Sequence, residues 1–296
     1  MNRRSAELQK TQWGFYQYSP VPSSETLREY YAKKYYQEGL GSYSQSYSDE
    51  QVKWWNVRAE LIAMMAQQIF PFQPEQTFLD IGCGEGWTMN AMASRGYAVQ
   101  GFDYSDFGIK KWNQQLLDSF SQGDIYDLLD TCVTEYKVFD IILLGNVIEH
   151  VPHPEKLLLS IRSVLSEQSL VIIVAPNDFS DLQSEIITNG FVDEPWWLCY
   201  PDHISYFNKN SMYNFLGSLG YSIHGTLGDY PIEYALYSKH TNYAQNRSVG
   251  PCVHELRVRH DNYLFGKSPD ALLEYYKLLG SIGEGRDLIY FCSQKK

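Results

Sequence analysis

A short apolar run that ends in alternating glycines constrains the fold more than any other stretch of this 296-residue chain. Residues 77–81 have the composition of a buried strand, interrupted by Asp80, and Gly82, Gly84 and Gly86 follow at every second position before a helix-like segment. A turn from a buried strand into a helix leaves backbone N–H groups free at the helix start. Glycine also lets a ligand approach the main chain closely. The stretch therefore predicts a ligand-binding strand–turn–helix unit.

The glycine spacing and the acid beside it indicate the kind of ligand. The pattern G-x-G-x-G is one residue shorter than the dinucleotide fingerprint G-x-G-x-x-G, and Asp80 would repel a pyrophosphate while attracting ammonium and sulfonium groups. We therefore disfavour a nicotinamide dehydrogenase. Residues 77–87 resemble motif I of the class I methyltransferases that use S-adenosylmethionine (SAM). The resemblance implies that these residues bind SAM: Asp80, Gly82, Cys83, Gly84 and Gly86.

Apolar runs alternate with helix-like segments through the middle of the chain. This alternation predicts a doubly wound α/β fold, because short apolar runs suit parallel strands buried on both faces. Strands are expected near residues 77–81, 98–102, 119–122, 139–144 and 170–175, and helices near 86–95, 106–117 and 154–164. Outside this part, helices are expected near 48–69, where Ser48 and Gln51 fit a capping box, and near 211–219 and 269–279, with strands near 222–228 and 287–292.

The resemblance implies a seven-stranded, Rossmann-like methyltransferase sheet whose last strand inserts antiparallel beside the fifth or sixth. With it we expect four parts: an aromatic-rich N-terminal helical extension or lid over 1–55, a SAM-binding core over 56–237, an insertion over 238–286 and the last core strand over 287–296. The aromatic side chains of the extension either contact a ligand or pack the extension onto the core.

Two acids after the second and third strands are expected at the nucleoside part of the cofactor. Asp103 follows Gly82 by 21 residues (103 − 82), the distance at which an acid accepts both ribose hydroxyls. The alternative is a turn or N-cap aspartate. Tyr104 or Phe102 is a candidate to cover the adenine edge, and the alternative for either ring is packing. By resemblance, Asp124 and Ile125 contact the adenine, and a surface-loop aspartate is the alternative.

The fourth strand runs into a polar loop, Gly145-Asn146-Val147-Ile148-Glu149-His150. This stretch resembles the loop after the fourth strand in the ubiquinone-biosynthesis-like branch of small-molecule methyltransferases, where E-H-V follows. Ligands bind outside the carboxyl ends of parallel strands, so Gly145 and Asn146 are expected at the cofactor. Glu149 and His150 are either catalytic or a pair that orders the loop. Because Asn146 replaces an acid, we expect no metal.

A third candidate for catalysis is His203. Residues 202–211 resemble a stretch of the same branch that crosses the substrate mouth. The ordinary pKa of histidine, about 6.5, suits a base that deprotonates a hydroxyl. The alternative is a histidine that holds its loop by hydrogen bonds.

Composition excludes several classes of partner. The formal net charge is −11 and no lysine–arginine cluster stands out, so nucleic-acid binding is not expected. Five scattered cysteines without a C-x-x-C pair indicate a reducing compartment. No apolar run approaches the roughly 20 residues of a membrane span, and no apolar signal core follows the first residues. We expect a cytoplasmic protein without membrane contact. The sequence leaves open whether the protein forms a homodimer.

These features together predict a SAM-dependent methyltransferase acting on a small molecule. The aromatic stretch 30–36 is similar to the segments that precede the core in methyltransferases of surface-polysaccharide and secondary-metabolite pathways. This resemblance implies O-methylation of a sugar, sugar nucleotide or related metabolite. The core motifs cannot name the acceptor, because methyl transfer mainly needs alignment of nucleophile, methyl and sulfur. The alternative function is a SAM-binding partner or regulatory protein without transferase activity.

Overall fold

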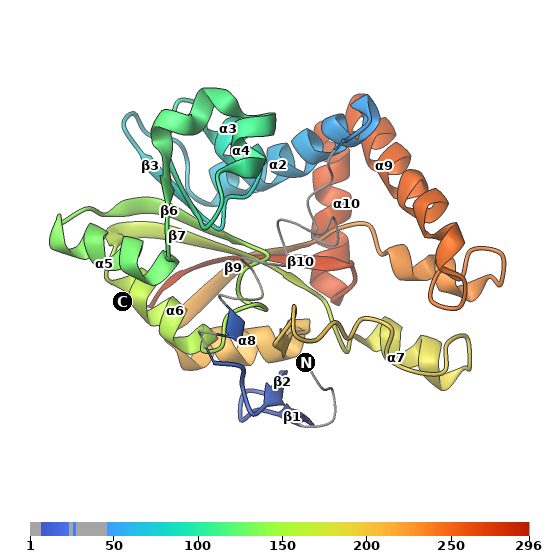
Figure 1. Cartoon of the computed structure of the whole chain (residues 1–296). Helices are drawn as coiled ribbons and strands as arrows, with labels where there is room; N and C mark the ends of the chain where they lie inside the picture. The colour runs from blue at the N-terminus through green and yellow to red at the C-terminus, as the bar shows by residue number, and fades with distance from the viewer. Residues whose placement is uncertain (1–6, 24–25, 28–45, 296) are drawn as a thin grey trace.

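A computed structural model describes residues 7–23, 26–27 and 46–295. Its centre is a seven-stranded sheet in the order β5-β4-β3-β6-β7-β10-β9 (Figure 1). Strands β5, β4, β3, β6 and β7 are parallel, and β10 lies antiparallel between β7 and β9. The strands are β3 (Thr77–Ile81), β4 (Ala98–Asp103), β5 (Phe120–Gln122), β6 (Phe139–Gly145), β7 (Leu165–Pro176), β9 (Tyr221–Gly228) and β10 (Asp287–Gln294). The predicted α/β class, the strand count and the inserted last strand are confirmed.

Helices cover both faces of the sheet, as Figure 1 shows. One face carries α2 (Asp49–Ile69), α3 (Trp87–Ala93), α4 (Phe107–Trp112) and α10 (Pro269–Ile282). The other carries α5 (Ile125–Thr134), α6 (Pro154–Arg162) and α8 (Lys209–Ser218). Two further helices, α7 (Asp181–Thr188) and α9 (Gly250–Lys267), lie toward one side of the sheet. No helix in the described part of the chain combines the length and apolarity that a membrane crossing would need.

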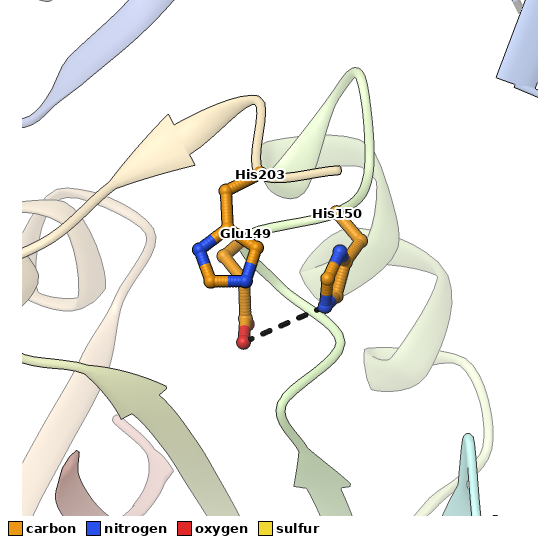
Figure 2. A group of neighbouring side chains, drawn as sticks. All are labelled: Glu149, His150 and His203. Atoms are coloured by element: carbon orange, nitrogen blue, oxygen red, sulfur yellow. Dashed lines mark ion pairs between the residues drawn. The ribbon is translucent and has the colours of Figure 1, made fainter. Parts of the chain in front are cut away.

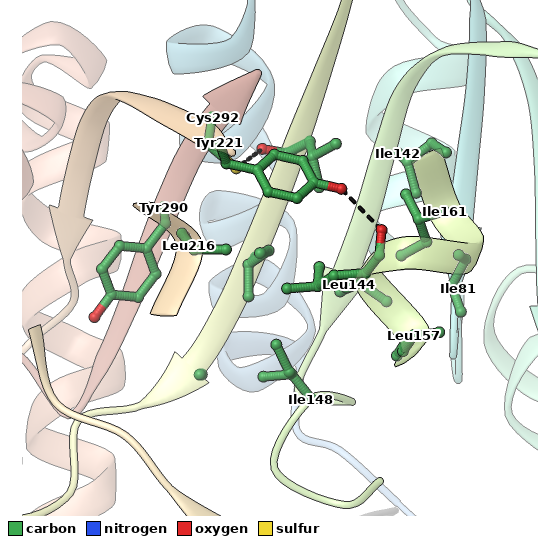
Figure 3. Close-up of a cluster of buried hydrophobic side chains, with 14 of the residues drawn as sticks. Ile81, Ile142, Leu144, Ile148, Leu157, Ile161, Leu216, Tyr221, Tyr290 and Cys292 are labelled. Carbon is green, nitrogen blue, oxygen red and sulfur yellow. Dashed lines mark hydrogen bonds between the residues drawn. The ribbon is translucent and has the colours of Figure 1, made fainter. Parts of the chain in front are cut away.

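The apolar strands are buried on both faces, which explains why they read as continuous apolar runs. Figure 3 shows the core between the sheet and helices α6 and α8, where Ile142 and Leu144 of β6 pack near Leu157 and Ile161 of α6. The hydroxyl of Tyr221, buried in this core, donates to the carbonyl of Leu158 at 2.9 Å. Its polar atom is therefore satisfied, as burial requires.

Helix α2 begins as predicted, because Ser48 and Gln51 form the expected capping box. The helix expected over 106–117 is instead broken at Asn113 into α4 and a 3₁₀ helix, η3 (Gln114–Ser119). The Asn113 amide donates to the carbonyl of Glu85 at 2.7 Å, and this bond ties the break to the glycine turn. Helices α5, α7 and α9 were not predicted, and β7 starts five residues before the predicted strand.

The expectation of a helical N-terminal extension is wrong for the described residues 7–19. They form a hairpin of β1 (Glu7–Lys10) and β2 (Tyr16–Ser19), and β2 pairs with β8 (Ser205–Tyr206) in a separate three-stranded sheet. Phe15 is buried against Phe207 and Phe215, with ring centroids 4.5 and 5.4 Å away. The aromatic residues of this part therefore pack the hairpin onto the core. The expectations for residues 28–45 lie outside the described residues.

Candidate functional site

A cavity of about 580 Å³ opens at the carboxyl ends of β3, β4, β6 and β7. This volume falls in the range of small-molecule sites, and the position is where open α/β sheets bind ligands. All the predicted site residues except Gly86 line it: Asp80, Gly82, Cys83, Gly84, Asp103, Tyr104, Asp124, Ile125, Gly145, Asn146, Glu149, His150 and His203.

The glycine turn after β3 has its alternating glycines for a conformational reason. Gly82, Gly84 and Gly86 all have positive φ, at 73°, 53° and 76°. L side chains rarely adopt this region. A Cβ on Gly82 would also come within 2.4 Å of a methyl group of Val147. Gly86, which caps α3, therefore serves the turn rather than the cavity wall.

The amides of the glycine turn itself are paired within the protein, whereas the free N–H groups expected from the sequence belong to the first turn of α3. The amides of Gly82 and Cys83 donate to the carbonyl of Phe102 at 2.7 and 3.0 Å, and that of Gly86 donates to the carbonyl of Cys83. The amide of Gly84 donates to the Asp103 carboxylate at 2.9 Å. The turn thus offers a ligand close contact with the main chain.

Asp103 fills its expected role in the turn and also lines the cavity, and its contact with the ribose stays a prediction. It is buried at the end of β4, and its two oxygens accept from the amides of Gly84 and Ser105 at 2.9 and 3.0 Å while the residue lines the cavity. These bonds fix the carboxylate at the cavity wall.

Tyr104 and Asp124 are joined at the β4–β5 end of the cavity. The Tyr104 hydroxyl donates to Asp124 Oδ2 at 2.5 Å, while Asp124 Oδ1 accepts from the amide of Tyr126 and caps α5. Ile125 is buried directly after the cap. The arrangement presents an aromatic ring and an apolar side chain around a fixed carboxylate.

Asp80 lies buried at the end of β3 on the cavity wall. Burial, and then the charge of Asp103, raise the pKa of its carboxyl to about 8. Two neighbouring buried acids favour a cationic ligand, because a positive charge between them offsets both the cost of burying the charged carboxylates and the repulsion between them.

The opposite end of the cavity holds Glu149, His150 and His203, which converge as Figure 2 shows. Glu149 is 1% exposed, and neither of its oxygens has a hydrogen bond of normal geometry from the described residues. His150 Nε2 lies 3.8 Å from Glu149 Oε1. Burial, opposed in part by His150, raises the pKa of Glu149 to about 7.

The two histidines differ in their surroundings. His150 Nδ1 is 2.7 Å from the carbonyl oxygen of Asp202. His203 Nδ1 is buried with no hydrogen-bond partner in the described part of the chain. Burial, followed by the charges of His150 and Arg286, holds the pKa of His203 well below its usual range. His203 is therefore neutral at pH 7 and can accept or donate one hydrogen bond.

Three distant segments hold this end together. The amides of Ile204 and Ser205 donate to the carbonyl of Glu149 at 2.8 and 3.1 Å, which locks the His203 segment onto the loop after β6. The side-chain amide of Gln17, on β2, donates to Ser205 Oγ at 3.0 Å and to the carbonyl of Pro152 at 3.3 Å. The N-terminal hairpin thus braces the two loops that carry the candidate catalytic residues.

These side chains are also close enough to share a cation. The ligand atoms of Glu149, His150 and His203 all lie within 4.8 Å of one another, as do those of Cys199, Asp202 and His203. Asn146 sits at the turn out of β6 with a φ of +55°, a conformation that asparagine tolerates better than most residues. It supplies no carboxylate, so the donor set there is one acid and two imidazoles.

Sequence reasoning missed several cavity residues, of which Arg58 is the clearest. It lies on α2, forms a salt bridge with Asp229 and is 3.0 Å from Asp287. Its guanidinium also lies over the Trp54 ring, 5.0 Å from the centroid. The available signal was a charged residue within the apolar face of the predicted helix 48–69. Glu85, Trp55 and Trp87 also line the cavity and were not predicted.

The comparison with known families settles the class of protein. Residues 54–225, more than half of the chain, match a family described as a methyltransferase domain. The chain belongs to this methyltransferase family. It is a class I enzyme, and its cofactor is SAM.

Curated relatives of the methyltransferase include the ubiquinone biosynthesis O-methyltransferases of Nitrosomonas europaea and Glaesserella parasuis. The first is 35% identical over 29% of this chain and 37% of its own length, and the second is 33% identical over 33% and 44%. The chain thus spans less than half the length of these two relatives. Solved structures of similar proteins include the plantazolicin methyltransferase BamL, with a TM-score of 0.49 and 17% identity, covering 83% of this chain and 87% of that one. A SAM-dependent methyltransferase from Archaeoglobus fulgidus has a TM-score of 0.47 and 17% identity, covering 79% and 93%.

The raised pKa of Asp80 predicts that SAM binding depends on pH. The carboxyl must lose its proton to attract a cation, so affinity for SAM is expected to rise up to about tenfold per pH unit from about pH 6 and to level off near pH 8. Calorimetry in two buffers of different ionisation enthalpy should show proton release on binding. Asp80→Asn should bind SAM more weakly and with a flat pH dependence; a persistent slope in this variant would assign the proton to another group.

Gln17 offers a test of the bracing by the hairpin. Gln17→Leu removes two donated hydrogen bonds, so local opening of the Ile204–Ser205 segment should become easier by about 1–2 kcal/mol, roughly 5- to 30-fold faster amide exchange. Hydrogen exchange measures this directly, and SAM affinity should not change. Gln9→Leu, at the exposed position opposite Gln17 in the hairpin, is the matched control. Equal exchange rates in the two variants would rule out the brace.

Proposed function

We propose that this methyltransferase transfers the methyl group of SAM to a hydroxyl oxygen of a small molecule, a sugar, sugar nucleotide or related metabolite. The observation that carries the proposal is Glu149, a buried carboxylate on the cavity wall that has no hydrogen bond of normal geometry from the described residues and whose pKa is raised to about 7. A hydroxyl is a poor nucleophile unless a base takes its proton, and a base works best when its pKa is near the ambient pH. The names of the two curated relatives, both O-methyltransferases, also support an oxygen acceptor.

We propose that SAM binds in the part of the cavity at the carboxyl ends of β5, β4 and β3. Asp103 accepts hydrogen bonds from the ribose hydroxyls, and Tyr104, Asp124 and Ile125 surround the adenine. The methionine part then reaches the glycine turn, where Asp80 faces its ammonium group. Arg58 is the only lysine or arginine on the cavity wall formed by the described residues, and it is proposed to face the carboxylate end.

SAM supplies a methyl group on a sulfonium, which leaves as a neutral thioether. The protein must align the acceptor oxygen with this methyl and remove the hydroxyl proton. We assign proton removal to Glu149. His203, neutral and 4.8 Å or less from the Glu149 oxygen, holds the acceptor oxygen in line by a hydrogen bond. His150 lies beside Glu149 and favours its ionised form.

The experiment that tests the proposal measures S-adenosylhomocysteine release from SAM with a panel of hydroxyl compounds. Release that depends on an added acceptor supports the proposal. Tight SAM binding without release for any acceptor would favour the alternative, a SAM-binding partner protein. A cytoplasmic location, a surface-polysaccharide or secondary-metabolite pathway and a homodimer stay predictions of the sequence.

Acid–base catalysis by Glu149 also predicts that chelators leave turnover unchanged. If no cation joins Glu149, His150 and His203, dialysis against EDTA should alter neither kcat nor the affinity for SAM. Metal analysis of the dialysed protein provides the control. Loss of turnover on dialysis, restored by a divalent cation, would replace proton removal by Glu149 with metal-assisted activation of the acceptor.

A further inference from the structure

We infer that the buried hydroxyl of Tyr206 is a positioning group for His203: it closes the loop 199–203 and so holds the His203 imidazole at the acceptor end of the cavity. Tyr206 is not among the described residues that line the cavity, so we expect it to act through His203 rather than on SAM or the acceptor. The inference rests on the proposed function, which gives His203 the task of aligning the acceptor oxygen.

The loop that carries His203 has little burial of its own. Cys199 is exposed and residues 200–203 are half-buried, whereas the buried chain resumes at Ile204. The amides of Asp202 and His203 both donate to the carbonyl of Cys199, at 2.9 and 3.1 Å, and form a tight turn. A segment with few buried contacts opens locally at low cost. A further contact is therefore needed to keep His203 in one place.

The Tyr206 hydroxyl makes that contact from inside the protein. It accepts a hydrogen bond from the amide of Cys199 at 3.2 Å and donates one to the carbonyl of His203 at 3.1 Å. A phenol hydroxyl can fill both roles at once. Because the amide of His203 donates to the carbonyl of Cys199, both backbone polar groups of His203 are bonded within this segment. The hydroxyl thus joins the two ends of the loop.

Tyr206 is itself held firmly. It is buried, and its backbone pairs with Tyr16 of β2. Its ring makes T-shaped contacts with those of Tyr18 and Phe179, with centroids 5.9 and 6.2 Å away. Burial raises the pKa of the Tyr206 hydroxyl well above its usual range, so the hydroxyl keeps the proton that it donates. The hydroxyl is therefore a fixed point that sets the position of the loop.

A separate anchor holds the chain after His203. The amides of Ile204 and Ser205 donate to the carbonyl of Glu149, and the rings of His150 and His203 meet in a T-shaped contact at 4.8 Å. Loss of the Tyr206 hydroxyl would free the turn before His203 and leave the bonds to Glu149 in place. The imidazole should then take several orientations, while the part of the cavity assigned to SAM stays unchanged.

Tyr206→Phe tests the inference, because phenylalanine fills the same space and removes only the hydroxyl. We expect kcat for acceptor-dependent release of S-adenosylhomocysteine to fall about 10- to 100-fold, since a small misplacement of an aligning group is costly. SAM affinity, measured by calorimetry, should not change. In a His203→Ala background the same substitution should cause no further loss, because Tyr206 acts through His203.

The matched control is Tyr221→Phe. Tyr221 is equally buried, and its hydroxyl donates to the carbonyl of Leu158 at 2.9 Å, away from the cavity wall. Both variants lose a buried hydroxyl and should melt at a lower temperature than the wild type. Only Tyr206→Phe should lose turnover.

A second measurement needs no acceptor. The nitrogen and proton NMR signals of the His203 ring, assigned by their absence from His203→Ala, report the surroundings of the imidazole. At one neutral pH they should shift or broaden in Tyr206→Phe and stay as in the wild type in Tyr221→Phe. Unchanged signals in Tyr206→Phe would contradict the inference and leave its hydroxyl with a role in stability alone.

The kinetic outcomes separate this inference from the proposed function. Wild-type kcat in Tyr206→Phe, weaker SAM binding, or a further loss in the His203→Ala background would each show that Tyr206 does not act through His203. Wild-type protein that binds SAM but releases no S-adenosylhomocysteine with any acceptor contradicts the proposed function instead. The NMR comparison then still decides whether Tyr206 positions His203.

Discussion

Glu149→Gln is expected to lower kcat by about 100- to 10,000-fold, the usual contribution of a general base. Glutamine keeps the size of the side chain and its place against His150, but it cannot accept a proton. SAM affinity should stay within a factor of about two, because Glu149 lies at the acceptor end of the cavity. Turnover is followed as S-adenosylhomocysteine release and SAM binding by calorimetry.

The matched control is Glu155→Gln on α6, a half-buried acid outside the cavity wall, which should retain wild-type turnover. His203→Ala should lower turnover less than Glu149→Gln and leave SAM affinity unchanged. Full activity of Glu149→Gln would remove Glu149 as the base and leave it as a residue that orders its loop.

The assignment of Glu149 as the base also fixes the direction in which kcat/KM changes with pH. The pKa of Glu149 is raised to about 7, and the base works only when deprotonated, so kcat/KM should rise as pH increases through about 7. His203 contributes no second step in this range because its pKa is held well below the usual value. A profile that falls on raising the pH through 7 would contradict the assignment.

Asp103→Ala is expected to weaken SAM binding by about 1–3 kcal/mol, roughly 5- to 150-fold, because the ribose hydroxyls lose charged acceptors. The same change removes the bonds from the amides of Gly84 and Ser105, so the glycine turn should also loosen. Calorimetry measures the affinity, and thermal unfolding without SAM measures the structural share.

Asp127→Ala provides the control for Asp103, since Asp127 is exposed in the first turn of α5 and lies outside the cavity wall. It should bind SAM like the wild type. Wild-type affinity in Asp103→Ala, with a lowered melting temperature, would leave Asp103 as a turn residue only.

Short-range pattern predicted the strands of the sheet, and together with the family resemblance it predicted part of the cavity wall. Buried parallel strands read as apolar runs, and the polar residues that follow them meet because the carboxyl ends of β3, β4 and β6 lie side by side. Asp103 and Glu149 could therefore be placed from their positions after a strand.

Residues whose roles depend on distant partners were beyond the same reasoning. The first hairpin finds its strand partner, β8, nearly two hundred residues away, so its own sequence carries no periodic signal. Helix α9 buries Asp261 rather than a clear apolar stripe, and that carboxylate accepts from Trp54 and Tyr276 at 2.8 Å each. Arg58 can lie buried at the cavity because it forms salt bridges with Asp229, just after β9, and with Asp287 of β10.

The brace between β2 and β8 has a consequence for how such enzymes diversify. The walls assigned to the donor come largely from one uninterrupted stretch, 80–146, whereas the opposite wall depends on pieces drawn from three remote places in the chain. Exchanging the N-terminal hairpin together with residues 199–206 between homologous chains should therefore change the selectivity for the acceptor and leave the part of the cavity assigned to SAM unchanged. Exchanging only one of these two segments would break the contacts between β2 and β8.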